Sequence, residues 1–393
     1  MTVKSGDIKS KIGQERKKVN VLFTSDALSI AGIRSLILDL VVKLDKKRFQ
    51  CAVAVIKSLK GSDAFYNAEL TDRNVPVKSL SLSHPQALFP IGVKRMKRII
   101  AAIDPDVICT SLLTDCFFVV RAAASSDIPI ISLFRGAADL SGLSRFKKRI
   151  LLDHLEFSDG IIALSEHAKK SYPRESATPI AVLPPMIDVS RFSPTGSRSF
   201  GAKQELTIGA VMTAKDETAL PMLIEIFGTI RNRLPFVKRL IIAGEGSNQA
   251  SVKQVVSAFG ISESVELLGP QEDIAAVYRR MDFLLSITEQ ESMGMAVLEA
   301  MSSRVIPIVG ENCLMPDIII NGKNGFYITH KDLEGTARML EGIFVDCVRN
   351  PAKFNKIAKA AREAVQEKFS SETVVPRYEE LFLRIAMNRE SAK

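Results

Sequence analysis

The chain has 393 residues, 46% of them hydrophobic, which is enough for two domains with full cores. No run approaches 18 uninterrupted apolar residues, and the charged N-terminus lacks the apolar segment of a secretory signal, so we expect neither a transmembrane helix nor export. The five cysteines are scattered and the four histidines lack metal-ligand spacing, which predicts a reduced, cytoplasmic protein without a metal site.

The net charge of +9 comes entirely from the N-terminal half. Residues 1–190 hold 28 Lys and Arg against 19 Asp and Glu, whereas residues 191–393 hold 25 of each. Two basic segments with apolar flanks, 94–98 and 145–149, concentrate the excess and suit an anionic membrane surface or an acidic acceptor. The alternative is a solvated helix face whose lysine stems lie along apolar surface. We see no nucleic-acid-binding module, and Trp is absent.

The first domain is predicted at 19–190, after a basic arm at 1–18 that we expect to be disordered. Val19–Ser25 has the composition of a buried strand, a turn containing Gly32 follows, and the apolar spacing of 36–44 indicates a helix. Strand, helix and strand with a glycine in the first turn are the opening of a Rossmann-like domain. We expect its further strands at 50–56, 75–82, 106–111, 128–134, 160–165 and 179–183.

A second domain is predicted at 205–370. The paired prolines at 184–185 favour an extended chain, and the polar stretch within 191–204 is typical of a linker. The strand pattern then restarts, and Gly244-Glu245-Gly246 follows one of the new strands, which is weak evidence for a binding turn by itself. We expect strands at 206–211, 239–243, 265–269, 282–287 and 305–309.

The stretch 281–309 carries the strongest functional pattern. A strand and a polar break are followed by helical spacing from Met293, and Arg304 is expected in the last turn of that helix. Gly294 at the helix start would let a phosphate approach the N-terminal N–H groups. Glu291 and Glu299 would be repelled by a phosphate and are better placed to accept hydrogen bonds from hydroxyls. This describes a nucleotide-sugar site; a surface loop with two solvated glutamates is the alternative.

The run from Glu291 to Met301, ESMGMAVLEAM, resembles the E-x7-E signature of retaining glycosyltransferases of family 4. The resemblance extends from Val19 to the chain end. It implies the α/β GT-B fold, with two Rossmann-like domains whose parallel sheets face an interdomain cleft. It also implies that the last helix, at about 371–390, packs back on the first domain.

The activity that the resemblance implies is retaining transfer of a sugar from a nucleotide-diphosphate donor to a glycan or lipid-linked acceptor. Uridine is the favoured nucleotide, and no metal or other cofactor is expected. The predicted catalytic residues are Glu291, which would bind sugar hydroxyls, and Lys215, which would neutralise the diphosphate. The acceptor-side residues are Gly32 and Arg135. The donor-binding set is Glu299, for the ribose, with Ser292, Met293, Gly294, Met295, Ala296, Gly244, Gly246 and Pro270.

Several features depart from the family pattern. Ala210 stands where the family has a diphosphate-binding Arg, Arg135 stands where it has a His, Arg304 replaces a usual Gly, and the loop at 31–34 lacks a Gly and a Glu. These departures favour a rival interpretation, a non-catalytic GT-B subunit that binds ligands or partners, whereas the two glutamates favour an enzyme. A GT-B epimerase is a weaker third interpretation. We expect Ala210→Arg to preserve or raise activity.

Overall fold

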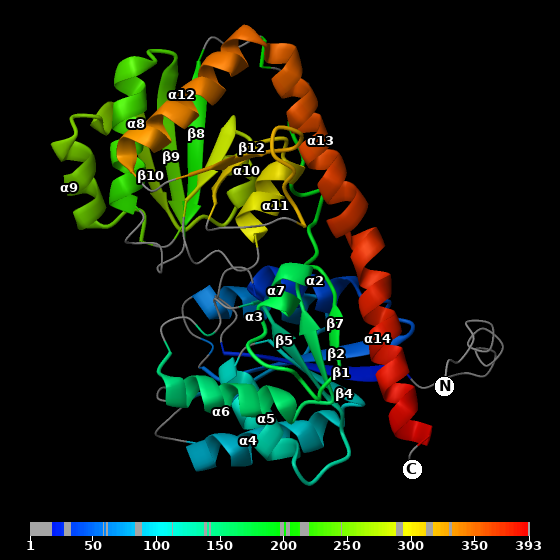
Figure 1. Ribbon diagram of the computed structural model, residues 1–393. Helices are drawn as coiled ribbons and strands as arrows, with labels where there is room; N and C mark the ends of the chain where they lie inside the picture. The colour runs from blue at the N-terminus through cyan, green and yellow to red at the C-terminus, as the bar shows by residue number, and fades with distance from the viewer. Residues whose placement is uncertain are drawn as a thin grey trace.

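The structure is a computed structural model. It describes residues 18–26, 33–57, 59, 62–82, 89–111, 113–136, 140, 143–196, 200–201, 205–212, 220–244, 246–287, 294–311, 317–329 and 332–391. Two α/β domains follow each other along the chain, and each is built on a parallel sheet, the first of seven strands and the second of six (Figure 1). The predicted fold class is therefore confirmed. No helix in the described ranges is long and apolar enough to cross a bilayer.

The N-terminal sheet has the strand order β3-β2-β1-β4-β5-β6-β7. Its strands are β1 (Val19–Ser25), β2 (Phe49–Val55), β3 (Val77–Ser79), β4 (Val107–Thr110), β5 (Ile130–Phe134), β6 (Gly160–Ala163) and β7 (Ile180–Val182). The helices between them are α2 (Ile33–Lys43), α3 (Ser62–Asp72), α4 (Phe89–Ile103), α5 (Leu113–Ala123), α6 (Arg145–Glu156) and α7 (Glu166–Lys170).

The C-terminal sheet repeats this order as β10-β9-β8-β11-β12-β13. Its strands are β8 (Leu206–Met212), β9 (Val237–Gly244), β10 (Val265–Gly269), β11 (Phe283–Ser286), β12 (Ile306–Gly310) and β13 (Phe326–Ile328). Its helices are α8 (Leu220–Arg233), α9 (Ala250–Ala258), the 3-10 turn Ser262–Ser264, α10 (Ile274–Tyr278), α11 (Met295–Ser302), α12 (Leu333–Arg349) and α13 (Pro351–Phe369). The last helix of the chain, α14 (Ser371–Ser391), follows α13 directly.

Each sheet is buried on both faces, which explains why its strands are nearly continuous apolar runs. In the N-terminal domain, α2 and α14 contribute to the core on one face, and α4, α5 and α6 to the core on the other. In the C-terminal domain, α8 and α12 cover one face while α10 and α11 cover the other. α14 therefore completes the N-terminal domain although it lies at the end of the chain (Figure 1).

The two chain crossings between the domains touch each other. Ile187, on the first crossing, forms an isolated parallel bridge with Ser370 at the α13–α14 junction, and its N–H donates to the Phe369 carbonyl at 2.8 Å. Arg362 on α13 donates to the carbonyls of Val189 at 3.2 Å and Phe192 at 3.0 Å. α13 thus holds the linker against the C-terminal domain.

Opposite ends of this connection are attached to different domains. Glu379 of α14 accepts hydrogen bonds from the N–H of Asp45, at 2.8 Å, and from the Arg48 guanidinium, at 3.0 Å. Those contacts hold α14 to the N-terminal domain. The chain therefore passes from one domain to the other at the α13–α14 junction, next to Ser370.

Two expectations about individual elements need correction. Arg304 was expected in the last turn of its helix, but α11 ends at Ser302 and Arg304 lies beyond it in the left-handed region, with φ 59°. Strand β13 was not predicted, because its three residues follow a glycine turn and are too few for a periodic pattern.

Candidate donor site

The candidate site begins where the C-terminal strand order reverses. β8 lies between β9 and β11, and Ile208 of β8 pairs with Phe283 of β11. In open parallel sheets, ligands bind outside the carboxyl ends of the strands at such a reversal. The segments that follow β8 and β11, 213–219 and 288–293, lie outside the described residues. So do four predicted site residues in them, Lys215, Glu291, Ser292 and Met293, and the acceptor-side Gly32.

Gly294 is the N-cap of α11, the helix that follows β11. It adopts φ 63° and ψ 20°, in the left-handed region that glycine enters without steric cost. The N–H groups of the next residues, Met295 and Ala296, belong to the first helical turn, where no preceding helical carbonyl is available to accept from them. This end of α11 therefore presents donors and a partial positive charge.

Glu299 lies one turn further along α11 and is half-buried. Its Oε2 accepts a hydrogen bond of 2.9 Å from the hydroxyl of Tyr278, the last residue of α10. The Tyr278 ring is fully buried and lies edge-on to Phe192, with 6.0 Å between ring centroids. A phenol held so rigidly limits the orientations of the Glu299 carboxylate, which can still accept from a ligand hydroxyl.

Gly244 ends β9 with φ 109°, and a Cβ there would lie 2.0 Å from the Met212 carbonyl oxygen of β8. The buried Ser247 hydroxyl donates to the Gly244 carbonyl at 2.9 Å and accepts from the Gly269 N–H at 3.0 Å. Gly269 precedes Pro270, and Gly246 has φ 87°. The predicted donor residues Gly244, Gly246 and Pro270 therefore lie on one bonded pair of turns at the carboxyl ends of β9 and β10.

On the N-terminal domain, the predicted acceptor-side residue Arg135 directly follows β5, and its side chain is half-buried. Elsewhere on this side, the N–H of His167, in the helix after β6, donates at 3.3 Å to the Asp317 carboxylate, downstream of β12. Both residues follow the carboxyl ends of their strands. The carboxyl edges of the two sheets therefore meet at this hydrogen bond.

Ala210 does not lie at the strand end. It is in the middle of β8, 1% exposed, within the core formed with α8 and α12. A guanidinium at this position would be buried in apolar surroundings without a partner, at high cost. The structure thus contradicts the expectation that Ala210→Arg preserves activity, since the substitution would first disrupt the core.

Three residues with a place in the site were not predicted: Tyr278, Ser247 and Asp317. Tyr278 and Glu299 are 21 positions apart, and Ser247 and Gly269 are 22 apart. No local period connects such pairs, so only the folded chain identifies them. The one sequence feature that could have indicated such a residue is Tyr278 itself, an aromatic side chain with a hydroxyl at the end of α10.

The parts of the chain that the structure describes contain no group of three or more His, Cys, Asp or Glu side chains placed to hold a metal ion. The titrating groups with shifted pKa values near the site belong to its supports. Burial lowers the pKa of Arg362, and the neighbouring Arg304 lowers it further. Burial alone would raise the pKa of Asp188 in the linker, but hydrogen bonds from Ser190 and Arg191 and the charge of Lys43 hold it below its ordinary value.

Comparison with known proteins identifies both domains. Residues 30–191 match the model of the family described as "Glycosyltransferase Family 4", and residues 203–346 match that of "Glycosyl transferases group 1". These two matches identify both domains of the chain as glycosyltransferase domains, and their arrangement is the GT-B fold.

Two curated relatives and one solved structure illustrate the range of similarity. An N-acetyl-alpha-D-glucosaminyl L-malate synthase of Bacillus anthracis is 28% identical over 39% of this chain and 40% of its own length. An exopolysaccharide phosphotransferase of Streptomyces coelicolor is 24% identical over 76% of this chain but only 30% of its own length. The chain thus spans well under half of these relatives.

The solved structure is Anabaena HepE in complex with UDP and glucose. It superposes with a TM-score of 0.78 over 93% of this chain and 100% of the other, at 16% sequence identity. At this identity the likeness concerns the fold.

Proposed function

We propose that the protein is a retaining glycosyltransferase that moves a sugar from a UDP-sugar to a glycan or lipid-linked acceptor, in the synthesis of a polysaccharide or glycoconjugate. The observation that carries the proposal is the position of Glu299. Its carboxylate is oriented by the buried Tyr278 one turn into α11, whose first turn offers backbone donors after Gly294. A ribose hydroxyl at Glu299 and a diphosphate at the helix start match one nucleotide-sugar.

The reaction breaks the bond between the anomeric carbon and the diphosphate and forms one to an acceptor oxygen, whose proton is released. Negative charge grows on the departing diphosphate, so groups that bind it more strongly at that stage accelerate the step. We assign this role to Lys215 and to the N–H groups of the first turn of α11. Glu291 would orient the sugar through its hydroxyls. Arg135 and Gly32 would face the acceptor, and no step of this proposal uses a metal ion.

The relatives support the donor class in part. HepE was solved with UDP and glucose and also with UDP-glucose, and the Bacillus relative is named for a reaction that involves an N-acetylglucosaminyl group. The family match and the shared fold favour the same class of ligand here.

Calorimetry with UDP tests the assignment of Glu299. Removing a hydrogen bond to a charged group costs about 1.5–3 kcal/mol, so Glu299→Gln should weaken binding roughly 10- to 150-fold. Tyr278→Phe removes only the orienting hydroxyl and should cost about 1 kcal/mol. Glu263→Gln, an exposed change in the same domain, is the matched control. Equal affinities for the wild type and Glu299→Gln would contradict the assignment.

A non-catalytic binding subunit is the second candidate, favoured by Arg135, which stands where the resemblance implies a His near the transferred sugar. Donor hydrolysis separates the two. An enzyme should release UDP from at least one of a panel of UDP-sugars, whereas a binding subunit should bind UDP and release none from any donor, alone or with acceptor glycans present.

A further inference from the structure

The outer surface of the N-terminal domain combines exposed aromatic rings with positive charge. Among the exposed large hydrophobic side chains that the structure describes, the two most exposed are Phe146, at 72%, and Phe157, at 70%. Phe146 is in the first turn of α6 and Phe157 is its C-cap. Rings of this size are normally buried, because leaving one in water forfeits about 1.5–3 kcal/mol. Two such exposed rings on one helix indicate a surface that binds another molecule.

The two rings lie on the same side of α6. They are 11 positions apart, which by helix geometry is about 20° in angle and roughly 16 Å along the axis. The positions between them on this stripe are the half-buried Ile150 and Asp153. Arg145, Lys147 and Arg149 are exposed beside the first ring. The face is therefore aromatic at both ends and has cations on both sides of the first ring.

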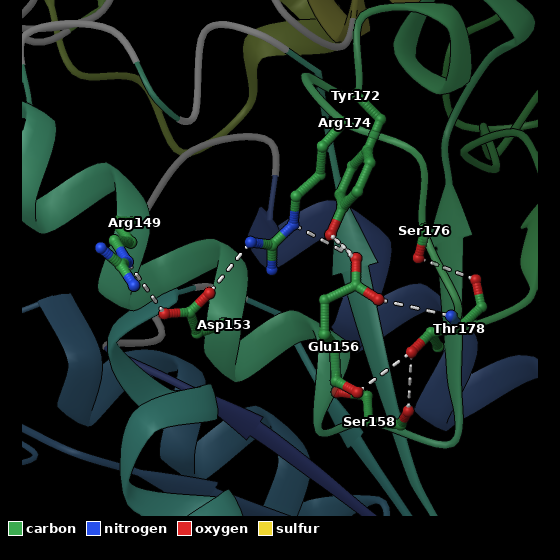
Figure 2. Close-up of polar contacts among 8 residues, drawn as sticks. All are labelled: Arg149, Asp153, Glu156, Ser158, Tyr172, Arg174, Ser176 and Thr178. Carbon is green, nitrogen blue, oxygen red and sulfur yellow. Dashed lines mark hydrogen bonds and ion pairs between the residues drawn. The ribbon is translucent and has the colours of Figure 1, made fainter.

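The acidic groups of α6 have cationic partners: Asp153 lies 3.9 Å from Arg149 of the same helix, and Arg174 approaches from outside it (Figure 2). Arg174 lies 2.9 Å from Asp153 and 3.6 Å from Glu156, and the Tyr172 hydroxyl donates to Glu156 at 2.8 Å. Burial by itself raises the pKa of Glu156, but the hydrogen bond from Tyr172, with the others it accepts and the charge of Arg174, brings its pKa below the ordinary value. Glu156 stays ionised and both acids are paired with cations, so the basic residues dominate the potential of this face.

Helix α4 extends the same character. Ile91, Lys94 and Arg98 recur at three- and four-residue spacing on its exposed side, while Met96 and Ile100 are buried. The inner sides of α4, α5 and α6 share one core against the sheet, so their outer sides turn away from it. Together the three helices hold nine Lys and Arg against three acids. In Figure 1 they lie at the end of the N-terminal domain remote from the C-terminal domain.

We propose that this surface, which we call the basic aromatic face, docks the protein on an anionic lipid bilayer. It is formed by Ile91, Lys94, Arg98, Phe146, Lys147 and Phe157. Exposed aromatic side chains enter the boundary between headgroups and acyl chains, and adjacent cations are attracted to anionic headgroups. The two exposed phenyl rings favour a bilayer over a small soluble anion, because acyl chains would bury them. The proposal does not depend on the catalytic assignment.

Vesicle binding of the full chain tests the proposal. The protein should sediment with vesicles that contain phosphatidylglycerol and not with phosphatidylcholine alone, and binding should fall as salt rises, because exposed charges are screened beyond about 8 Å at physiological ionic strength. Lys94→Glu with Lys147→Glu should reduce binding at least about tenfold, since each cation near an anionic surface contributes appreciably. Phe146→Ser with Phe157→Ser should reduce binding at every salt concentration.

The matched control uses α9 of the C-terminal domain, where Phe259 and Lys253 are both exposed. Phe259→Ser with Lys253→Glu should leave vesicle binding unchanged. Circular dichroism and UDP affinity should be the same for all three double variants, which separates loss of docking from loss of folding or of the donor site.

The depth to which the face enters the bilayer is measured with an introduced tryptophan, because the natural chain contains no tryptophan. In Phe146→Trp the emission should shift to shorter wavelength on anionic vesicles and be quenched by brominated lipid, whereas Phe259→Trp should show neither effect. The proposal is overturned if the wild type does not bind anionic vesicles. It is also overturned if the serine variants bind as well as wild type, or if the face binds only a soluble polyanion such as dextran sulfate.

Discussion

The N-terminal and C-terminal domains have the same strand order around their first strand, yet their helical surfaces differ. On the C-terminal domain, α8 and α12 are joined by ion pairs, in which Arg233 contacts Glu334 at 2.6 Å and Glu341 at 3.6 Å. On the N-terminal domain, α4 and α6 carry an excess of cations and two exposed phenylalanines. One fold thus supports two surfaces, because the core constrains only the inward-facing residues of each helix.

The comparison also separates two kinds of function. The donor-site candidates lie on the C-terminal domain, at strand ends held by tight backbone approaches such as that of Gly244 to Met212. The charge lies on the N-terminal domain, on helix faces where substitution is sterically easy. Changes in the first region should affect folding and chemistry, whereas changes in the second should affect association.

The largest effect should come from placing the same cation in these two regions. Ala210→Arg buries a charge in the core of β8 and should lower the free energy of unfolding by roughly 3 kcal/mol or more. Ala101→Arg, at an exposed position of α4, should change it by less than about 0.5 kcal/mol. Urea denaturation followed by circular dichroism measures both. Similar stabilities for the two variants would mean that Ala210 is not enclosed as described.

Lys215→Ala should have the next largest effect and should act on rate. If Lys215 stabilises the departing diphosphate, its loss should lower kcat about 10²–10³-fold, or roughly 2.7–4 kcal/mol, with a smaller effect on KM. Lys253→Ala, on α9 of the same domain, is the control for a lost surface charge. A wild-type rate in Lys215→Ala would show that the diphosphate lies elsewhere and would leave the glutamates alone to define the site.

The smallest effect should be a dependence on pH that arises in the N-terminal domain. Burial lowers the pKa of His154 below its ordinary value of 6.5, against a hydrogen bond to the Ile150 carbonyl that raises it. The unfolded chain therefore takes up a proton more readily, so stability should fall as pH drops through and below about 6.5. His154→Phe should remove this pH-dependent part of the stability and keep the packing on Phe117. Urea denaturation of both proteins at neutral and at mildly acidic pH measures the difference. If acid sensitivity is the same in both proteins, His154 is not its source.

Local patterns in the sequence predicted the two-domain α/β fold and most strands. Strands such as β8 and β11 are buried on both faces, so each is a nearly uninterrupted apolar run. Such a run predicts a strand even when the neighbouring strands are not known. Tyr378, Leu381 and Phe382, which recur at helical spacing, likewise mark the buried side of α14. The start of α11 at Gly294 followed from a change of period at a glycine.

Other features depended on where distant segments meet. Tyr278 orients Glu299, Arg174 pairs with Asp153, and Arg362 reaches the linker across 173 positions. In the sequence, Ala210 aligned with the diphosphate-binding Arg of the family motif. In the structure, the position of β8 in the sheet places its side chain in the core. The sequence alone shows which residues prefer burial, because that preference depends on the side chain and its near neighbours along the chain. Which partner a buried or half-buried polar group finds is settled only when the chain returns to it in three dimensions.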